Sequence, residues 1–397
     1  MIIETEEQKR VIDNAVRHIK YGDELVYQFA GWAGTGKTFT IKRIIERIGI
    51  PLSRVAVMTY IGQAAIVLRT KGLWNAKTIH SWMYELVKEE IVNEKGEKEI
   101  DPIYNKPKVK LTFRPKKLVG IDYIIIDEAG TVPRYMKKDI ESQGIKIIAC
   151  GDLGQLPPVK DKPAYLYEGK IDYLTQPMRQ NINDGIYYLS TRARSGLPIH
   201  AGFYGNAMVI EEQDLSLETI MNSQIIICGK NSTRDKYNNL VRNNILNHVT
   251  KLPQFGEKII CRKNNWDLEV DGISLANGLI CQVINPPSVT DFDGKIFKID
   301  IKPDLLNSFF ENIMCDYNYF TADSDTRRLL KNDKYSIGEK FEFAYAITTH
   351  LSQGAEYRNG IYISEFLNRD IQNNLDYTGI TRFTDGLIYV IPNRKYF

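Results

Sequence analysis

The sequence predicts an α/β protein built on parallel sheets with helices on both faces. Short β-branched runs bounded by turn residues alternate with segments of helical length, such as TFTIKRIIERIG after Lys37, which is typical of a parallel sheet. The runs are apolar throughout, as expected for strands that are covered on both faces. In the first half of the chain they are LVYQFAG from Leu25, VAVMT from Val55, YIIIDE from Tyr123 and IKIIACGD from Ile145.

The second half repeats this pattern less clearly, and two stretches of the chain interrupt it. Residues 87–113 are highly charged around a glycine-centred turn, which predicts a β-hairpin insertion. From about residue 255 to residue 340 the chain has short strands and prolines without helix–strand alternation, which predicts a small β insertion. Outside these two stretches, the strands expected in the second half are SQIIICG from Ser223, FEFAYAITTH from Phe341, GIYIS from Gly360 and GLIYVIP from Gly386.

Composition limits the class of protein without identifying it. The 397 residues suggest two to three domains, and the net charge of +3 neither indicates nor excludes a nucleic-acid partner. The five scattered cysteines favour buried free thiols in a reducing compartment over disulfides or a metal site. No apolar run approaches the roughly 18 residues of a membrane span, and the acidic start MIIETEEQKR has no signal-peptide core. We therefore expect the protein to stay where it is made.

The segment GWAGTGKT, residues 31–38, fits the phosphate-binding pattern G-x-x-x-x-G-K-[ST]. It follows a predicted strand and precedes a predicted helix, which is the context that the pattern requires. Glycines let backbone N–H groups surround phosphate oxygens, and the start of the helix adds a favourable dipole. Lys37 is expected to reach the β- and γ-phosphates of ATP, and the Thr38 hydroxyl to hold Mg²⁺.

Two carboxylates, Asp127 and Glu128, end the run YIIIDE. Because α/β sheets bind ligands at the carboxyl ends of their strands, both are expected to face the nucleotide. Asp127 is the candidate Mg²⁺ partner, and Glu128 is the candidate base for an attacking water. With a phosphate-binding loop upstream, we favour these roles over solvated caps of a strand.

The segment GDLGQLPPV, residues 151–159, ends a third strand of the same predicted sheet. Gln155 is expected near the γ-phosphate, where it would orient water. Phosphoryl transfer also needs positive charge for its transition state, and Arg179 in LTQPMRQ and Arg382 in YTGITR are candidates. By spacing alone, each of these arginines is more typical of a surface residue.

The order of these segments resembles that of superfamily 1 helicases of the 5′→3′ branch, the RecD-like and phage Dda-like group. FGEKIICRKNNWDLEVDGISLANGLICQVIN, residues 255–285, also resembles the RecD-like segment that leads into an SH3-like insertion. The matching motifs, in chain order, are TEEQ (5–8), GWAGTGKT (31–38), VMTYIGQAA (57–65), TIHS (78–81), IIIDEAG (124–130), GDLGQLPPV (151–159), LTQPMRQ (174–180), AITTHLSQGAE (346–356) and YTGITR (377–382).

The resemblance implies two RecA-like P-loop domains with ATP in the cleft between them. The first would span residues 1–179 with an inserted pin domain at about 84–115, and the second residues 180–397 with an inserted SH3-like domain at about 256–340. Arg179 and Arg382 would act as arginine fingers. The residues implied to bind the nucleotide are Gln8, which would read adenine, and Gly31, Gly34, Thr35, Gly36, Lys37, Thr38, Gly354 and Glu356.

The resemblance also implies a track for single-stranded DNA across both domains. Hydroxyls and imidazoles suit phosphate oxygens, and a ring stacks on an unpaired base. Gln63 and Leu351 replace lysines that the family commonly carries on this track, and Gly130 replaces a serine. The wedge of the pin is left open between Tyr104 and Phe113. The implied DNA contacts are Thr59, Thr78, His80, Thr348, His350 and Ser352.

These expectations describe an ATP- and Mg²⁺-dependent 5′→3′ translocase and DNA helicase that serves replication, repair or recombination. Its expected partners are single-stranded DNA, junctions of duplex and single strand, and a single-stranded-DNA-binding or replication protein. We expect a monomer without membrane contact, located in the cytoplasm, as a phage protein would be in its bacterial host. Two alternatives stay open: an RNA-directed helicase of the same superfamily, and a nucleotide-gated remodelling factor that does not unwind.

Overall fold

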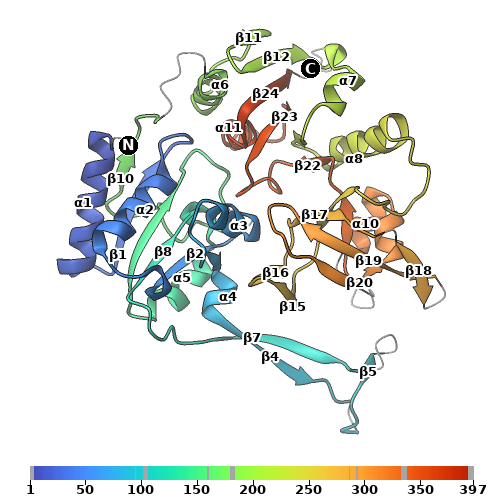
Figure 1. Ribbon diagram of the computed structural model, residues 1–397, viewed down its shortest axis with the longest axis horizontal. Coiled ribbons are helices and arrows are strands. Elements are labelled where there is room, and N and C mark those ends of the chain that lie inside the picture. The colour runs from blue at the N-terminus through green and yellow to red at the C-terminus, as the bar shows by residue number, and fades with distance from the viewer. Residues whose placement is uncertain are drawn as a thin grey trace. The chain divides into compact units, whose positions relative to one another are not determined.

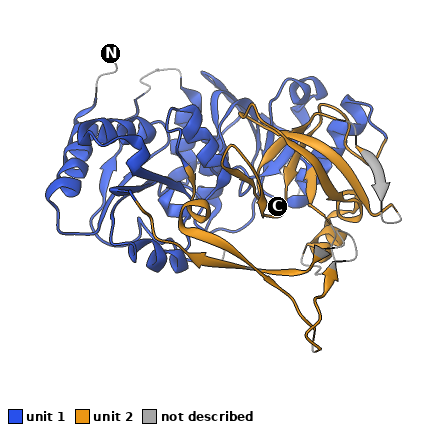
Figure 2. Cartoon of the chain, turned by 60° about the horizontal axis from the view of Figure 1, so that its bottom comes forward, with its two compact units in different colours: residues 1–76, 120–249, 343–397 blue, residues 77–119, 250–342 orange. Residues whose placement is uncertain are grey.

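The computed structural model describes residues 4–93, 95–101, 106–158, 161–178, 184–285, 287–291, 294–331 and 338–391. The chain divides into two compact units, coloured separately in Figure 2. Unit 1 comprises residues 1–76, 120–249 and 343–397, and unit 2 comprises residues 77–119 and 250–342. Among the described residues, no helix combines the length and the apolar character that crossing a membrane requires.

The first sheet of unit 1 is parallel, and its strands follow the order β10-β1-β9-β8-β2. Strands β1, β8 and β2 are labelled in Figure 1. Strands β2 and β8 are buried at every position, which explains why their sequences are apolar throughout. The strands are β1 (Val26–Gly31), β2 (Val55–Thr59), β8 (Tyr123–Ile126), β9 (Lys146–Gly151) and β10 (Asp172–Leu174).

Helices α1 and α2 pack their apolar faces on this sheet, with Ile12 and Ile41 in one buried cluster with Ile125. Helix α1 begins with a capping box, in which Thr5 accepts from the Gln8 N–H and the Gln8 side chain accepts from the Thr5 N–H. The helices of this part are α1 (Glu6–Tyr21), α2 (Lys37–Ile48) and the shorter α3 (Gly62–Thr70) and α5 (Arg134–Glu141), with 3₁₀ turns at Leu52–Arg54 and Ala129–Thr131.

The second sheet of unit 1 has the order β11-β12-β24-β23-β13-β22 and is parallel except where β11 meets β12. Its strands are β11 (Gly202–Tyr204), β12 (Ala207–Glu211), β13 (Ile226–Cys228), β22 (Ala346–Thr348), β23 (Tyr357–Ile363) and β24 (Phe383–Ile391). Its helices are α6 (Gly185–Arg194), α7 (Leu217–Met221), α8 (Asn231–Leu240) and α11 (Gln372–Ile380), with a 3₁₀ turn at Glu212–Asp214 and a π-helical turn at Val241–Ile245.

The prediction of one strand over FEFAYAITTH is wrong. The segment forms β21 (Phe341–Phe343) and β22, which belong to different sheets. The buried Asn238 side chain explains the break, because its amide donates to the carbonyls of Phe343 and Ala346 and accepts from the Ala346 N–H. These bonds satisfy backbone groups that a continuous strand would have paired with a neighbour.

Unit 2 contains a long antiparallel pair and a separate β sheet. Strands β4 and β7 pair from Tyr84 opposite Pro115 to Glu90 opposite Val109. The separate sheet of unit 2 has the order β18-β19-β17-β14-β21, and β20 also pairs with β19. The elements up to residue 119 are β3 (Lys77–Thr78), α4 (Ile79–Met83), β4 (Tyr84–Glu90), β5 (Ile100–Asp101), β6 (Lys106–Pro107) and β7 (Val109–Pro115). Those from residue 250 onward are β14 (Lys258–Cys261), β15 (Asn265–Val270), β16 (Ile273–Leu275), β17 (Ile280–Val283), β18 (Ser288–Asp291), β19 (Ile296–Pro303), β20 (Phe310–Asp316), α9 (Tyr317–Thr321), α10 (Ser324–Leu330) and β21.

An aromatic cluster joins the two sequence segments of unit 2. The His80 ring stacks on Trp266 of β15 at a centroid distance of 4.9 Å, and Phe113 meets Trp266 edge-on at 5.7 Å. Tyr84 packs against both His80 and Phe113. Burial among these rings lowers the pKa of His80 to about 4. The imidazole is therefore neutral at neutral pH and carries no charge for a phosphate.

This burial predicts a specific acid sensitivity. Between about pH 6.5 and pH 4, the unfolded chain binds a proton at His80 that the folded chain excludes, so stability falls as the pH falls through this window. Trp266→Ala opens one face of the ring, so we expect the pKa of His80 to rise toward its ordinary value and part of this pH dependence to disappear. NMR titration of the His80 ring protons measures the first effect, and urea unfolding against pH measures the second.

Phe255→Ala removes an exposed aromatic ring from the same unit and serves as the control, with no change in the His80 titration expected. An unchanged His80 titration in Trp266→Ala would contradict the explanation by stacking.

Candidate nucleotide-binding site

The loop between β1 and α2 has the backbone geometry of a phosphate-binding loop. Gly34 and Gly36 have φ values of 82° and 80°, a left-handed conformation that glycine adopts without strain. At Gly36, a Cβ would also come within 2.3 Å of the Met178 sulfur and 2.7 Å of Gln8 Nε2. The conformation therefore favours glycine at residue 36, directly before α2, and a side chain there would also have to displace the ends of the Met178 and Gln8 side chains.

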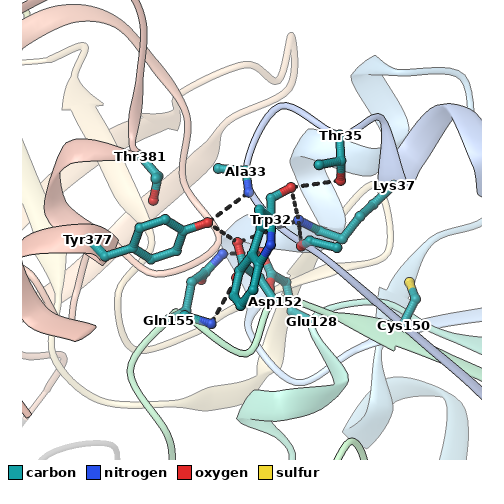
Figure 3. A network of polar contacts seen from close by, with 12 residues as sticks. Trp32, Ala33, Thr35, Lys37, Glu128, Cys150, Asp152, Gln155, Tyr377 and Thr381 are labelled. Atoms are coloured by element: carbon teal, nitrogen blue, oxygen red, sulfur yellow. Dashed lines mark hydrogen bonds and ion pairs between the residues drawn. The ribbon is translucent and has the colours of Figure 1, made fainter. Parts of the chain in front are cut away.

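The Lys37 ammonium is held at this loop by several oxygen atoms (Figure 3). It donates to the carbonyl of Gly31 at 2.9 Å and lies 3.4 Å from the carbonyl of Trp32. Its third neighbour is the buried carboxylate of Asp152, 3.7 Å away. Lys37 therefore contacts a residue that directly follows β9. The predicted motifs GWAGTGKT and GDLGQLPPV meet at its side chain.

The carboxylates predicted at the end of β8 lie beside this lysine. Glu128 has φ 51° and ψ 39°, a left-handed conformation that is uncommon outside glycine and is found at functional sites. Desolvation raises the pKa of Glu128, and the neighbouring Asp127 adds to this rise, while Lys37 and Arg382 oppose it. A carboxylate with a raised pKa is a stronger base, which suits proton abstraction from water.

Two side chains from the loop and strand of β9 contact these carboxylates. Gln155 Nε2 lies 3.5 Å from Glu128 Oε1. The buried Cys150 thiol donates a hydrogen bond to Asp127 Oδ1 at 3.2 Å. Burial raises the pKa of the Cys150 thiol, and the Asp127 carboxylate raises it further, so the thiol keeps its proton and remains a donor.

A cavity of about 410 Å³ opens between these groups and residues of the second sheet of unit 1. This volume is within the range of small-molecule sites. Arg382 belongs to the lining, and its guanidinium is fixed by the carbonyls of Thr378 and Ala355. The predicted site residues that line the cavity are Gly34, Gly36, Lys37, Thr38, Asp127, Glu128, Gln155, Gly354, Glu356 and Arg382.

Three predicted nucleotide contacts lie behind the loop instead of in the cavity lining. The buried Gln8 amide donates to the Thr35 carbonyl and contacts the Met178 sulfur. Thr35 is buried, with its hydroxyl donating to the Trp32 carbonyl, and Gly31 ends β1. These residues support the loop from its rear face. Arg179, the other predicted arginine finger, and Tyr104, one wedge candidate, lie outside the described residues.

The residues predicted to contact DNA are mostly buried. Thr59 and Ser352 donate their hydroxyls to the carbonyls of Ile61 and Thr349, and Thr348 is also buried. Thr78 caps α4 by accepting from the Ser81 N–H, and burial lowers the pKa of His350. His80 belongs to the aromatic cluster. In this structure the hydroxyls of Thr59, Thr78 and Ser352 act on the local backbone, and the DNA role of all six residues remains a prediction.

Sequence reasoning missed several residues that shape the site. Cys150 and Asp152 flank Gly151 at the end of β9, and the sequence analysis assigned neither of them a role. Tyr377 and Trp32 stand inside the recognised motifs YTGITR and GWAGTGKT, but nothing in those motifs indicates that the two side chains meet. The sequence could have indicated these two residues only through their positions within motifs. Which side chains they contact depends on the folded structure.

The geometry of the loop and its lysine defines a P-loop nucleotide-binding protein. Residues 5–205, half of the chain, match the family described as AAA domain, and the chain belongs to that family.

Three similar proteins extend this result. An uncharacterized protein, MJ1519, of Methanocaldococcus jannaschii is 25% identical over 91% of this chain and 36% of its own length. The RecBCD enzyme subunit RecD of Buchnera aphidicola subsp. Schizaphis graminum is 25% identical over 89% of this chain and 68% of its own length. A crystal structure of Bacteroides Pif1 bound to ssDNA covers 98% of this chain and 92% of that chain, with a TM-score of 0.56 and 17% identity.

The chain therefore spans only about a third of the length of the first of these relatives. The structural likeness shows the fold and confirms the predicted α/β class with RecA-like parallel sheets. The resemblance to superfamily 1 helicases that the motif order indicated is confirmed as well. The domain boundaries and the individual site residues stay predictions.

The contact between Cys150 and Asp127 predicts an effect on Mg²⁺. Cys150→Ala removes the donor that orients this candidate Mg²⁺ ligand, and loss of such a partner weakens metal affinity by about tenfold. We expect the Mg²⁺ concentration that half-saturates Mg²⁺-dependent ATP binding to rise by about this factor. Titration of a fluorescent ATP analogue with Mg²⁺ measures the effect, and Cys150→Ser, which keeps a donor, should retain most of the affinity.

Cys228→Ala is the matched control, because Cys228 is a buried thiol at the end of β13 whose hydrogen bonds go to backbone carbonyls. Equal Mg²⁺ dependence in Cys150→Ala and Cys228→Ala would show that the Cys150 thiol does not orient Asp127.

Proposed function

We propose that the protein is an ATP-dependent 5′→3′ single-stranded DNA translocase and DNA helicase. The observation that carries the proposal is a cavity lined by a lysine, a glutamate, a glutamine and an arginine, which come from the layers of both sheets of unit 1. Hydrolysis that needs groups from both sheets couples chemistry to their relative movement, as in hinge cycles. The chain's similarity to RecD and to a Pif1 that was crystallised with ssDNA supports DNA as the partner.

The residues of the cavity fit the needs of phosphoryl transfer. Lys37 and the glycine-rich loop would hold the phosphates, and Thr38 with Asp127 would hold Mg²⁺, which neutralises charge on the phosphate oxygens. Glu128 would take a proton from the attacking water, with Gln155 beside it to orient that water. Arg382 would stabilise charge in the transition state, and Arg179 is proposed as its companion.

The partner and location proposals follow from this activity. We propose that single-stranded DNA and its junctions with duplex are bound by a monomer in the cytoplasm, and that a single-stranded-DNA-binding or replication protein cooperates with it. The hairpin of β4 and β7 is proposed as the pin that separates strands, with Phe113 as the wedge candidate among the described residues.

The proposal is tested with a duplex that carries either a 5′ or a 3′ single-stranded overhang, in the presence of ATP and Mg²⁺. We expect unwinding from the 5′ overhang, and ATP hydrolysis that increases on addition of single-stranded DNA. Unwinding only from the 3′ overhang would overturn the polarity. Hydrolysis that responds more to RNA than to DNA of equal length would favour the RNA-directed alternative.

Glu128→Gln tests the proposed base. We expect ATP binding to persist, because the loop and Lys37 are unchanged, while hydrolysis falls by about 10²–10⁴-fold. Glu46→Gln removes an exposed carboxylate on α2 and is the matched control for this charge change. Full strand separation by Glu128→Gln would instead indicate a nucleotide-gated factor that acts by binding alone.

A further inference from the structure

The loop that follows β9 forms hydrogen bonds with several residues that belong to the layer of the second sheet of unit 1. Leu156 donates its N–H to Thr378 Oγ1 at 3.0 Å and accepts from Gln353 at 2.9 Å. Asn374 of α11 donates to the carbonyls of Gly154 and Gln155. A movement of α11 must therefore move this loop or break several hydrogen bonds.

Tyr377 of α11 extends this connection to the phosphate-binding loop itself (Figure 3). Its buried hydroxyl donates to Asp152 Oδ2 at 2.7 Å and accepts from the Ala33 N–H at 2.8 Å. Burial raises the pKa of Tyr377, and Asp152 raises it further, so the hydroxyl stays protonated and donates. One side chain of the second layer thus bonds to both nucleotide-binding loops of the first.

Asp152 is placed between Tyr377 and Lys37. Its Oδ1 accepts from the Gly154 N–H, and its Oδ2 accepts from Tyr377 while lying 3.7 Å from the Lys37 ammonium. The side chain of Asp152 has no exposed surface, and opposite charges attract more strongly where water is excluded. A buried carboxylate needs its partners, because losing one leaves its charge without compensation.

A second contact between the two layers lies beside the first. The Arg194 guanidinium of α6 stands 3.8 Å from the centre of the Trp32 ring, and Tyr377 meets the same ring edge-on at 6.5 Å. Gly154 leaves room for the Tyr377 ring, because a Cβ there would come within 2.7 Å of it. Tyr377 is therefore held in place by packing as well as by hydrogen bonds.

We propose that Tyr377 is a positioning residue for nucleotide binding, which acts on Lys37 through Asp152. The inference rests on the proposed ATPase site. Phosphate oxygens that bind Lys37 compete with Asp152 for the ammonium, so Asp152 then depends more on the Tyr377 hydroxyl. Nucleotide binding thereby strengthens the bond between Asp152 and α11, and the position of α11 in turn affects nucleotide affinity, as thermodynamic linkage requires.

Tyr377→Phe tests this role, because it removes the hydroxyl and keeps the ring. The lost hydrogen bond matters more when phosphate occupies Lys37 than when Asp152 still has the lysine as its partner. We expect the Kd for ADP and for a non-hydrolysable ATP analogue to rise by about tenfold, which is within the range for a hydrogen bond to a charged group. Isothermal titration calorimetry measures this without hydrolysis or DNA.

A double-mutant cycle separates an action through Asp152 from a general loss of packing. We expect Tyr377→Phe to change the Kd by less than about twofold in an Asp152→Asn background, because the charge through which it acts is gone. The same tenfold effect in both backgrounds would overturn the proposal. The matched control is Tyr123→Phe, since Tyr123 is a buried tyrosine of β8 whose hydroxyl has no hydrogen-bond partner among the described residues.

Thermal unfolding without nucleotide provides the second measurement, and it also applies if Asp152→Asn does not fold. We expect Tyr377→Phe to unfold at a lower temperature than Tyr123→Phe, because Asp152 loses a hydrogen-bond partner, but to remain folded at the temperature of the titration, where it binds nucleotide more weakly. Unchanged nucleotide affinity in Tyr377→Phe would refute the proposal. A wild-type protein that binds nucleotide but unwinds no duplex would overturn the helicase function and leave this inference standing, whereas a wild type that binds no nucleotide would overturn both.

Discussion

The structure depends above all on the compensation of one buried carboxylate, Asp152. Its oxygens bond to Tyr377 and to the Gly154 N–H, and Lys37 lies close enough to pair with it. A charge without exposed surface is tolerated only when such partners surround it. These partners come from the phosphate-binding loop, the loop after β9 and α11. Compensation of one buried carboxylate therefore links three segments of the chain.

Backbone geometry imposes a second constraint on the same place. Gly36 takes a left-handed conformation where a side chain would collide with Met178, and Glu128 takes a similar conformation without being glycine. The strain at Glu128 directs its carboxylate into the cavity beside Lys37 and Arg382. Desolvation there raises the pKa of Glu128. The buried position of the side chain at the end of β8 therefore also makes it a stronger base.

Unit 2 has a different physical basis. Its two sequence segments are joined by stacked and edge-on aromatic rings at His80, Phe113 and Trp266, together with an ion pair between Lys88 and Asp267. Aromatic pairs of this kind combine burial of apolar area with preferred ring geometry, and exposed ion pairs add little. The base of the hairpin is thus fixed mainly by packing, which explains why a histidine that resembles a DNA contact has lost most of its tendency to carry charge.

The sequence by itself determined the features that depend on local chemistry. The glycine pattern around Lys37, the carboxylates after a buried strand and the apolar runs of β2 and β8 each follow from rules that act over a few residues. Only the tertiary structure decided which side chains meet: Tyr377 with Asp152, Cys150 with Asp127, and Asn238 with the backbone that divides β21 from β22. These pairs are 225, 23 and 105 residues apart in the chain, and no local periodicity or propensity encodes a contact between residues that only folding brings together.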